Sequence, residues 1–273
     1  MFKIPFIDPH ETLCHSYNVV RTTIEISQNT PLPSHLDIPI LQDAHMPTHV
    51  LAVIDTPIPS EPLQSPPIIF PILAPINAEL FATRFHKDIT SNSSHLAAPG
   101  STMPIPFWNE ETQQMVVTLP VIRLCVPHPP SMPLLLLFGL GLHRQYELPP
   151  SSPQTSPTGS SASSLRSNSP NRRRSSNARN PQGISTNLLV TYLLPLPVIE
   201  EYPAASAMAQ TMEEVCEGQE LERRIRFNHG LWRNVLSLAP KHIEIIDTVR
   251  MAWNITSEAR RIRERLKDVG FLS

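Results

Sequence analysis

Residues 131–142 read SMPLLLLFGLGL and contain the longest apolar run of the chain. Leucine is not β-branched, so four consecutive leucines favour a buried helix over a strand. Ser131 and Pro133 suit the first turn of this helix. The run is roughly half as long as the ~20 residues that a membrane-spanning helix needs. It therefore predicts a buried helix and no membrane segment.

The region before this run is rich in proline and predicts short strands. Of the 31 prolines, 21 lie between residues 31 and 150, which excludes long helices from most of this region. β-Branched residues favour strands at residues 49–55 (HVLAVID), 67–73 (PIIFPIL) and 115–126 (MVVTLPVIRLCV). Because Pro71 and Pro120 interrupt the last two, we expect each of these to be an edge strand or two short strands.

Two further segments complete this half of the chain. Residues 77–89 predict a short helix, because apolar residues recur at helical spacing and Asn77 can cap its N-terminus. The recurring residues are Leu80, Phe81, Phe85 and Ile89. Residues 1–35 show mixed polarity without a clear period, so we expect a loosely tethered N-terminal arm.

A segment without acidic residues divides the chain in two. Residues 151–187 hold 12 serines and five arginines. So little apolar surface cannot offset the entropy of ordering, so we expect a disordered Ser/Pro/Arg-rich linker. Residues 187–194 then favour a final strand. Apolar periodicity predicts four helices after it, at about residues 203–218, 221–239, 243–253 and 256–269, with Trp232 and Trp253 in their core.

The linker carries the candidate regulatory residues. An unneutralised basic cluster can act as a nuclear-import signal or a weak nucleic-acid contact. This cluster consists of Arg172, Arg173, Arg174 and Arg179. Candidate phosphorylation sites precede prolines or follow arginines, and phosphate groups there would mask the basic charge. These sites are Ser152, Ser156, Ser169, Ser175 and Ser176. The alternative is a solubilising spacer in which these motifs occur by chance.

The sequence contains no signature of catalysis, cofactor binding or metal binding. It lacks a G-x-S-x-G nucleophile elbow and a glycine-rich phosphate loop. Cys125 and His128 lie near a proline-interrupted strand without the rest of a triad. Pro47 opposes the helix that would align the two histidines of the tightest group of potential metal ligands. That group is Cys14, His15, His45 and His49. We expect no catalytic residues, cofactors or metal ligands.

Composition narrows the cellular context. The formal net charge is −2, which gives no general attraction to nucleic acid or to an acidic membrane. The three cysteines are widely spaced, so a disulfide framework is not expected. The first residues do not form a secretory signal. We expect a protein of the cytoplasm, the nucleus or both.

Three local patterns resemble the BTB/POZ interaction fold. Phe70-Pro71-Ile72-Leu73 leading into residues 75–85 looks like that family's strand and following helix, residues 117–120 look like its next strand, and residues 131–142 look like its apolar helix. The family's usual tyrosine before the terminal glycine is Phe138 here. Its Asp-Val opening strand and its dimerisation helix have no clear counterpart, so homo-oligomerisation stays open. The resemblance implies binding to protein partners.

The C-terminal helical region is similar to fungal developmental regulators of the clampless type. The similarity rests on residues 200–203 (EEYP), 230–236 (GLWRNVL) and 248–254 (TVRMAWN). Those regulators control clamp-cell formation in mushroom-forming fungi. The resemblance implies a regulator of sexual development that acts through protein partners, and it supplies no catalytic residues.

These expectations combine into an α+β protein with four regions. They are an N-terminal arm (1–35), a BTB-like core (36–150), a disordered linker (151–187) and a helical extension (188–273). We expect a non-enzymatic adaptor. The alternatives are an enzyme without recognisable short motifs and a weak nucleic-acid-binding regulator. An enzyme should show a concave pocket with converging polar side chains, whereas an adaptor should show an exposed apolar surface.

Overall fold

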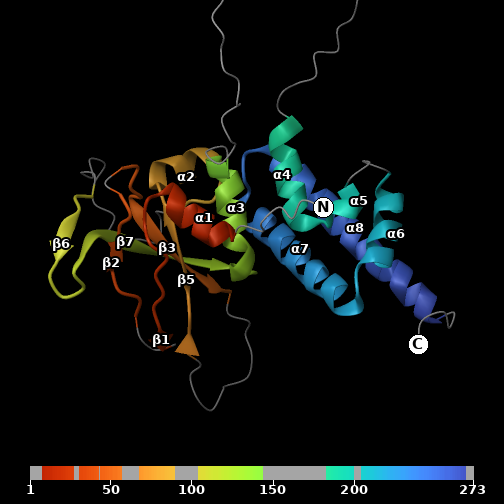
Figure 1. The fold of residues 1–273 in the computed structure, drawn as a ribbon, viewed down its shortest axis with the longest axis horizontal. Helices are drawn as coiled ribbons and strands as arrows, with labels where there is room; N and C mark the ends of the chain where they lie inside the picture. Colours follow the sequence, from red (N-terminus) through yellow and green to blue (C-terminus); the bar gives the residue numbers. More distant parts are fainter. Residues whose placement is uncertain are drawn as a thin grey trace, which may run out of the picture.

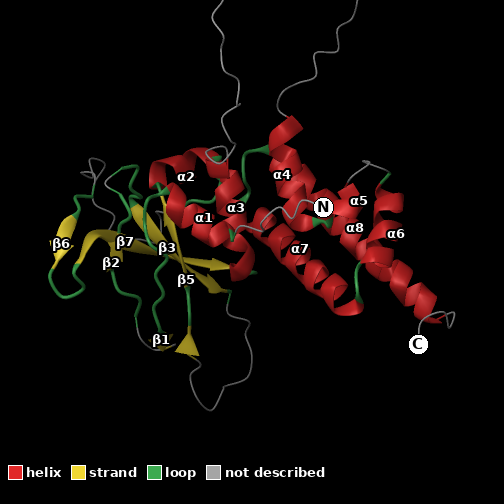
Figure 2. Ribbon diagram, viewed as in Figure 1, coloured by secondary structure: helices red, strands yellow, loops and turns green. Residues whose placement is uncertain are grey.

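A computed structural model describes residues 8–27, 31–42, 44–56, 68–89, 104–143, 183–199 and 204–268. The protein is a mixed α+β structure whose elements form two parts along the chain (Figure 1). The first part contains the strands and helices α1–α3. The second part contains helices α4–α8 and, within the described ranges, no strand (Figure 2).

The main sheet has five strands of mixed direction. Its strands are β2 (His35–Pro39), β3 (His49–Asp55), β5 (Ile72–Ile76), β6 (Phe107–Asn109) and β7 (Gln114–Val126). The order is β2-β7-β3-β5, and β6 forms a hairpin with the start of β7. β3 and β7 are parallel, with Val50 opposite Val121, and the other pairs are antiparallel. Two short strands, β1 (Ile26–Ser27) and β4 (Ile68–Ile69), form a separate sheet.

The strand predictions are confirmed in part. β3 has the predicted bounds, and Pro71 separates β4 from β5, which belong to different sheets. β7, however, is one 13-residue strand at the centre of the sheet, so the prediction of an edge strand or two short strands is wrong there. Pro120 is tolerated because residues 116–120 pair with β2, whereas residues 121–126 pair with β3. The buried positions change from odd-numbered before Pro120 to even-numbered after it, so the inward face shifts by one residue.

Helix α2 (Ala78–Arg84) begins as predicted and ends early. Asn77 caps it, because its side-chain oxygen accepts a hydrogen bond from Leu80 N at 2.9 Å. The predicted extension to residue 89 is wrong, since Phe85 adopts extended backbone and forms a β-bridge with Pro240. The Phe81 and Phe85 rings stack at 4.6 Å, which holds this turn against the core.

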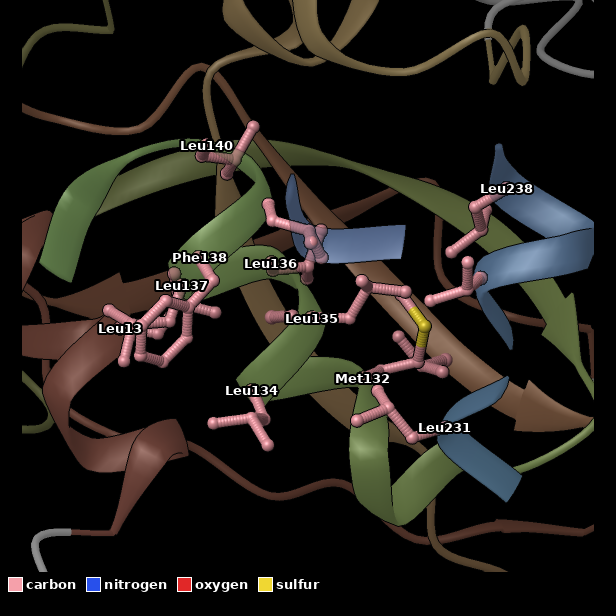
Figure 3. Close-up of a cluster of buried hydrophobic side chains, with 14 of the residues drawn as sticks. Leu13, Met132, Leu134, Leu135, Leu136, Leu137, Phe138, Leu140, Leu231 and Leu238 are labelled. Atoms are coloured by element: carbon pink, nitrogen blue, oxygen red, sulfur yellow. The ribbon is translucent and has the colours of Figure 1, made fainter. Parts of the chain in front are cut away.

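The apolar run forms helix α3 (Met132–Gly139), preceded by the 3₁₀ helix η1 (Pro129–Ser131). Every residue of α3 is buried, which confirms the prediction of a buried helix. Its side chains contact Leu13 from α1 on one side and Leu231 and Leu238 from α7 on the other (Figure 3). Burying one such leucine contributes about 1.5–3 kcal/mol, so α3 supplies much of the shared core.

The N-terminal region contains a folded helix instead of the expected loose arm. Helix α1 (Pro9–Ser16) begins at Asp8, whose carboxylate accepts a hydrogen bond from His10 N at 3.0 Å. α1 packs on α3 and β5, and Leu13 and Cys14 are buried in the core. The sequence shows no period here because both ends of this short helix and several of its polar side chains are buried too.

The second part is helical throughout its described residues. Its helices are α4 (Gly183–Leu193), α5 (Leu196–Ile199), α6 (Ala205–Val215), α7 (Gly218–Leu238) and α8 (Ile243–Asp268). The predicted strand at residues 187–194 is wrong, because these residues belong to α4 and the turn after it, and Leu189, Val190 and Leu193 pack in the core. A continuous apolar run of this length fits a buried helix as well as a strand.

The two predicted last helices form one continuous helix, α8. The hydroxyl of Thr256 donates to Ala252 O at 3.0 Å and does not act as an N-cap. Trp232 of α7 and Trp253 of α8 stack at 5.9 Å and are only half-buried, so the prediction that both lie in the core holds in part.

A buried asparagine joins the two parts. Asn234 of α7 is fully buried; its Oδ1 accepts from His128 N at 3.1 Å, and its Nδ2 donates to His128 O at 2.7 Å and to Ser131 Oγ at 3.0 Å. A second link follows α7, where His86 N donates to Ala239 O at 3.0 Å and Lys241 N donates to Arg84 O at 2.8 Å. The helical part is therefore attached to the sheet part by backbone and side-chain hydrogen bonds as well as by the shared core.

Candidate functional site

The residues predicted for regulation lie outside the described residues. They are Arg172, Arg173, Arg174 and Arg179 in the basic cluster, and Ser152, Ser156, Ser169, Ser175 and Ser176 as phosphorylation candidates. The structure therefore leaves their roles as predictions.

The cysteines and histidines considered as ligands have separate, local partners. His49 is buried and its Nδ1 lies 2.8 Å from Thr48 Oγ1, while burial raises the pKa of the Cys14 thiol to about 12. His15 is paired with Glu11 in α1. Within the described part of the chain, no three His, Cys, Asp or Glu side chains are grouped closely enough to hold a metal ion.

Cys125 and His128 do not form a catalytic pair. Cys125 is exposed on β7, whereas His128 packs edge-on against Phe227 with ring centroids 5.9 Å apart. Burial lowers the pKa of His128, and nearby Asp55 opposes part of this shift. The backbone of His128 is held by Asn234, so this residue serves to dock η1 on α7.

One surface of the sheet part is markedly apolar. Four large apolar side chains are exposed before and within the β6–β7 hairpin, at the end of the sheet farthest from the helical part (Figure 1). They are Ile105 (79% exposed), Phe107 (43%), Trp108 (52%) and Met115 (38%), and we call them the hairpin surface. Trp108 lies directly opposite Met115 in the ladder, so these two side chains share a face.

A cavity of about 300 Å³ lies between the two parts of the protein. Its apolar wall comes from β5, α3, α4 and α7, and its polar groups come from α1, the segment after it, and α7. The apolar wall includes Ile72, Pro133, Leu134, Leu193 and Phe227. The polar groups include Asp8, His10, Arg21, Arg223, Arg224 and Asn228. The cavity thus brings together residues from both ends of the chain.

Most of these polar groups are paired with each other or with neighbours. Arg21 Nη1 donates to Asp8 Oδ2 at 2.8 Å, and Arg224 Nε donates to Glu220 Oε1 at 2.6 Å. His10 Nε2 lies 2.9 Å from Leu73 O. Burial lowers the pKa of His10, which this hydrogen bond partly opposes, so His10 is neutral at pH 7.

The carboxylate beside the cavity is held in its charged form. Burial would raise the pKa of Glu220, but hydrogen bonds from Arg223 and Arg224 and their charges lower it overall. Among the described residues that line the cavity, none is a serine, cysteine or lysine. This set of side chains can bind an anion or an apolar group, and it lacks the usual nucleophile beside a free base.

The sequence reasoning missed both features. The hairpin surface had a local signal, because Ile105, Phe107 and Trp108 form an apolar stretch interrupted by Pro106 and bounded by polar residues. The cavity had none, because its residues come from segments between Asp8 and Asn228 that only the tertiary fold brings together.

Comparison with known proteins gives no match: no family model, curated protein or solved structure is significantly similar to the chain. None of the helices in the described ranges combines the length and the apolar character that crossing a membrane requires.

Proposed function

We propose that the protein is a non-enzymatic adaptor that binds other proteins through its hairpin surface. The observation that carries this proposal is the clustering of four exposed large apolar side chains, Ile105, Phe107, Trp108 and Met115, at one end of the sheet. Large contiguous apolar patches on soluble proteins mark interaction sites, and tryptophan is enriched among the residues that dominate binding energy.

The cavity does not favour catalysis over binding. Its histidine is engaged with the Leu73 carbonyl, and its carboxylate at Asp8 is engaged with Arg21 and with the backbone of α1. A general base needs a lone pair directed at the substrate proton. The alternative of an enzyme without short motifs therefore has weaker support than an adaptor.

The resemblances described above supply the biological role that we propose. We infer a regulator of fungal sexual development with a BTB-like core, acting on protein partners in the cytoplasm or the nucleus. The chain order of β5, α2, β7 and α3 supports this proposal, because the BTB-like motifs imply a strand, a helix, a strand and an apolar helix in that order. The Ser/Pro/Arg-rich linker is proposed as a disordered, phosphorylation-controlled element.

The test is affinity purification with surface variants. Tagged wild-type protein, the double variant Ile105→Glu/Trp108→Glu and the control Leu236→Glu are recovered from cells that express them. Leu236 is an exposed leucine on α7 in the helical part, so the control adds a charge at an equally exposed site. Removing one hot-spot tryptophan costs about 2 kcal/mol or more, a loss of roughly 30-fold in affinity.

We expect partners that bind the wild type and Leu236→Glu and are lost from the double variant. Identical partners for all three proteins, with the variants folded as judged by circular dichroism, would reject the hairpin surface as the binding site. Neutralising Arg172, Arg173 and Arg174 in a fluorescent fusion tests the nuclear-import proposal separately, and unchanged localisation would reject it.

A further inference from the structure

We propose that the cavity between the two parts binds a small organic monocarboxylate with an apolar body. This proposal is independent of the hairpin surface, which lies at the opposite end of the sheet (Figure 1). The volume of about 300 Å³ is at the small end of the range for ligand pockets, roughly 300–1,000 Å³. The cavity therefore suits a ligand of the size of an aryl-substituted short-chain acid.

The charge at the cavity favours a single negative charge on the ligand. Three guanidinium groups line it, those of Arg21, Arg223 and Arg224. Asp8 pairs with Arg21, and Glu220 pairs with both Arg223 and Arg224. Two carboxylates thus face three guanidinium groups, and one positive charge remains for a ligand to balance.

The arginines also offer the geometry that a carboxylate requires. A guanidinium group has five N–H donors in a planar fork, which matches the two oxygens of a carboxylate. With described residues, Arg21 forms one hydrogen bond, to Asp8, which leaves most of its donors available. Arg224 is mostly buried, with its side chain 19% exposed, so a carboxylate bonded to it would be shielded from water.

A buried and unpaired polar atom gives independent support for a built site. Asn228 of α7 lines the cavity and is 1% exposed. Its Nδ2 donates to Leu193 O at 3.1 Å, which fixes the orientation of the amide, and its Oδ1 has no hydrogen-bond partner among the described residues. Buried polar atoms are satisfied in most folded proteins, and a missing partner is explained by a bound molecule or by water.

The apolar wall selects against a hydrophilic anion. Ile72, Leu134, Leu193 and Phe227 line the cavity together with prolines from η1 and α3. Inorganic phosphate would leave these side chains in contact with a strongly hydrated ion. A carboxylate with an aryl or alkyl body fills this wall and places its charge among the arginines.

The test compares a carboxylate with its neutral amide on the full-length chain. Binding of 3-phenylpropanoate, 3-phenylpropanamide and inorganic phosphate is measured by isothermal titration calorimetry or ligand-observed NMR at millimolar concentrations. We expect 3-phenylpropanoate to bind at least about 10-fold more tightly than the other two, because a hydrogen bond to a charged group is lost in the amide.

Matched arginine variants assign the site. Arg224→Gln and Arg21→Gln should each weaken 3-phenylpropanoate binding by about 10-fold or more. Arg226→Gln, on the same helix as Arg224 but exposed and outside this cavity, should leave the affinity unchanged. The hairpin double variant should also leave it unchanged, which separates this proposal from the adaptor proposal. Thermal unfolding without ligand confirms that each variant is folded.

Three results would overturn the proposal. They are equal binding of the acid and the amide, an equal loss of affinity in Arg226→Gln and Arg224→Gln, and the absence of saturable binding by 3-phenylpropanoate. Tighter binding of phosphate than of 3-phenylpropanoate would also overturn it, because the apolar body would then contribute nothing.

Discussion

Gly230 occupies the middle of helix α7, where its Cα faces the ring of His128. A Cβ atom at this position would lie 2.2 Å from His128 Cγ, so any side chain here displaces the ring. His128 in turn is held through its backbone by Asn234. The absence of a side chain at one residue thus permits the close approach of η1 to α7.

We expect Gly230→Ala to destabilise the protein by about 1–3 kcal/mol because of this overlap. In an unobstructed helix interior the same change stabilises by about 1 kcal/mol, so the sign of the effect is diagnostic. The matched control is Gly218→Ala at the start of α7, where the nearest atom would be Arg263 Nη1 at 3.8 Å. Urea unfolding of the two variants gives the comparison, and a stabilising Gly230→Ala would contradict the docking that we describe.

The three cysteines should differ in reactivity. Cys125 is exposed on β7, whereas Cys14 and Cys216 are buried. Burial raises the pKa of Cys14 to about 12 and also raises that of Cys216, so neither is a thiolate at pH 8. Iodoacetamide at pH 8 should modify Cys125 first in the native protein, and Cys14 and Cys216 only after denaturation. Mass spectrometry of the labelled peptides reads this directly, and early labelling of Cys14 would argue against its place in the core.

Buried histidines make stability depend on pH. Burial lowers the pKa of His10, His49 and His128 below the model value of 6.5. Below that value the unfolded chain binds protons that the native protein does not, so the free energy of unfolding falls as the pH drops from about 6.5 toward the folded pKa values. Urea unfolding at pH 7.5 and 5.5 should show this loss. His49→Gln should reduce the loss and His35→Gln, at an exposed position, should not; equal behaviour of the two would remove His49 from the explanation.

At the scale of elements, α8 is tied to the end of α6 by one mostly buried arginine. Arg263 Nε donates to Glu213 Oε1 at 3.0 Å, and its Nη2 donates to Glu213 O and to Cys216 O, both at 2.6 Å. The last carbonyls of a helix lack intrahelical partners, so this side chain completes the C-terminus of α6. The α6–α8 packing therefore depends on an interaction that apolar patterns do not encode.

We expect Arg263→Ala to lower the free energy of unfolding by about 3 kcal/mol, because it leaves a buried carboxylate and buried carbonyls without partners. Arg260→Ala is the control on the same helix, since its partner Glu264 is exposed and surface ion pairs contribute little. Chemical denaturation monitored by circular dichroism measures both. Equal effects of the two substitutions would show that α6 does not rely on Arg263.

The elements also show what the sequence could predict. β3, the start of α2 and the buried helix α3 were predictable because their signals are local: β-branched residues, an asparagine cap and a leucine run. α1 and α4 were not, since α1 is short and carries buried polar side chains such as His10 and Ser16, and α4 is apolar on several faces. β7 was misjudged because the effect of Pro120 depends on which partner strand lies beside it. Neither half of the cavity is recognisable without the other.

At the scale of the whole molecule, the sheet and helical parts should unfold together. The shared core around α3, the Asn234 bonds and the bridge between Phe85 and Pro240 all join them. Trp108 reports on the sheet part, and Trp232 and Trp253 report on the helical part. Variants that keep only Trp108, or only the other two, should give coincident urea midpoints by fluorescence. Two separate midpoints would show that the parts are independent domains.

The pairing of β3 with β7, and of His128 with Asn234, has a consequence for synthesis of the chain on the ribosome. β3 acquires its parallel neighbour only after residue 126 has been translated, and the His128–Asn234 bonds join residues 106 positions apart. Closing such long loops is entropically costly until both partners are present. The leucine run of α3 therefore emerges well before α7, which covers it, and the nascent chain carries an unprotected apolar segment that a cotranslational chaperone would recognise.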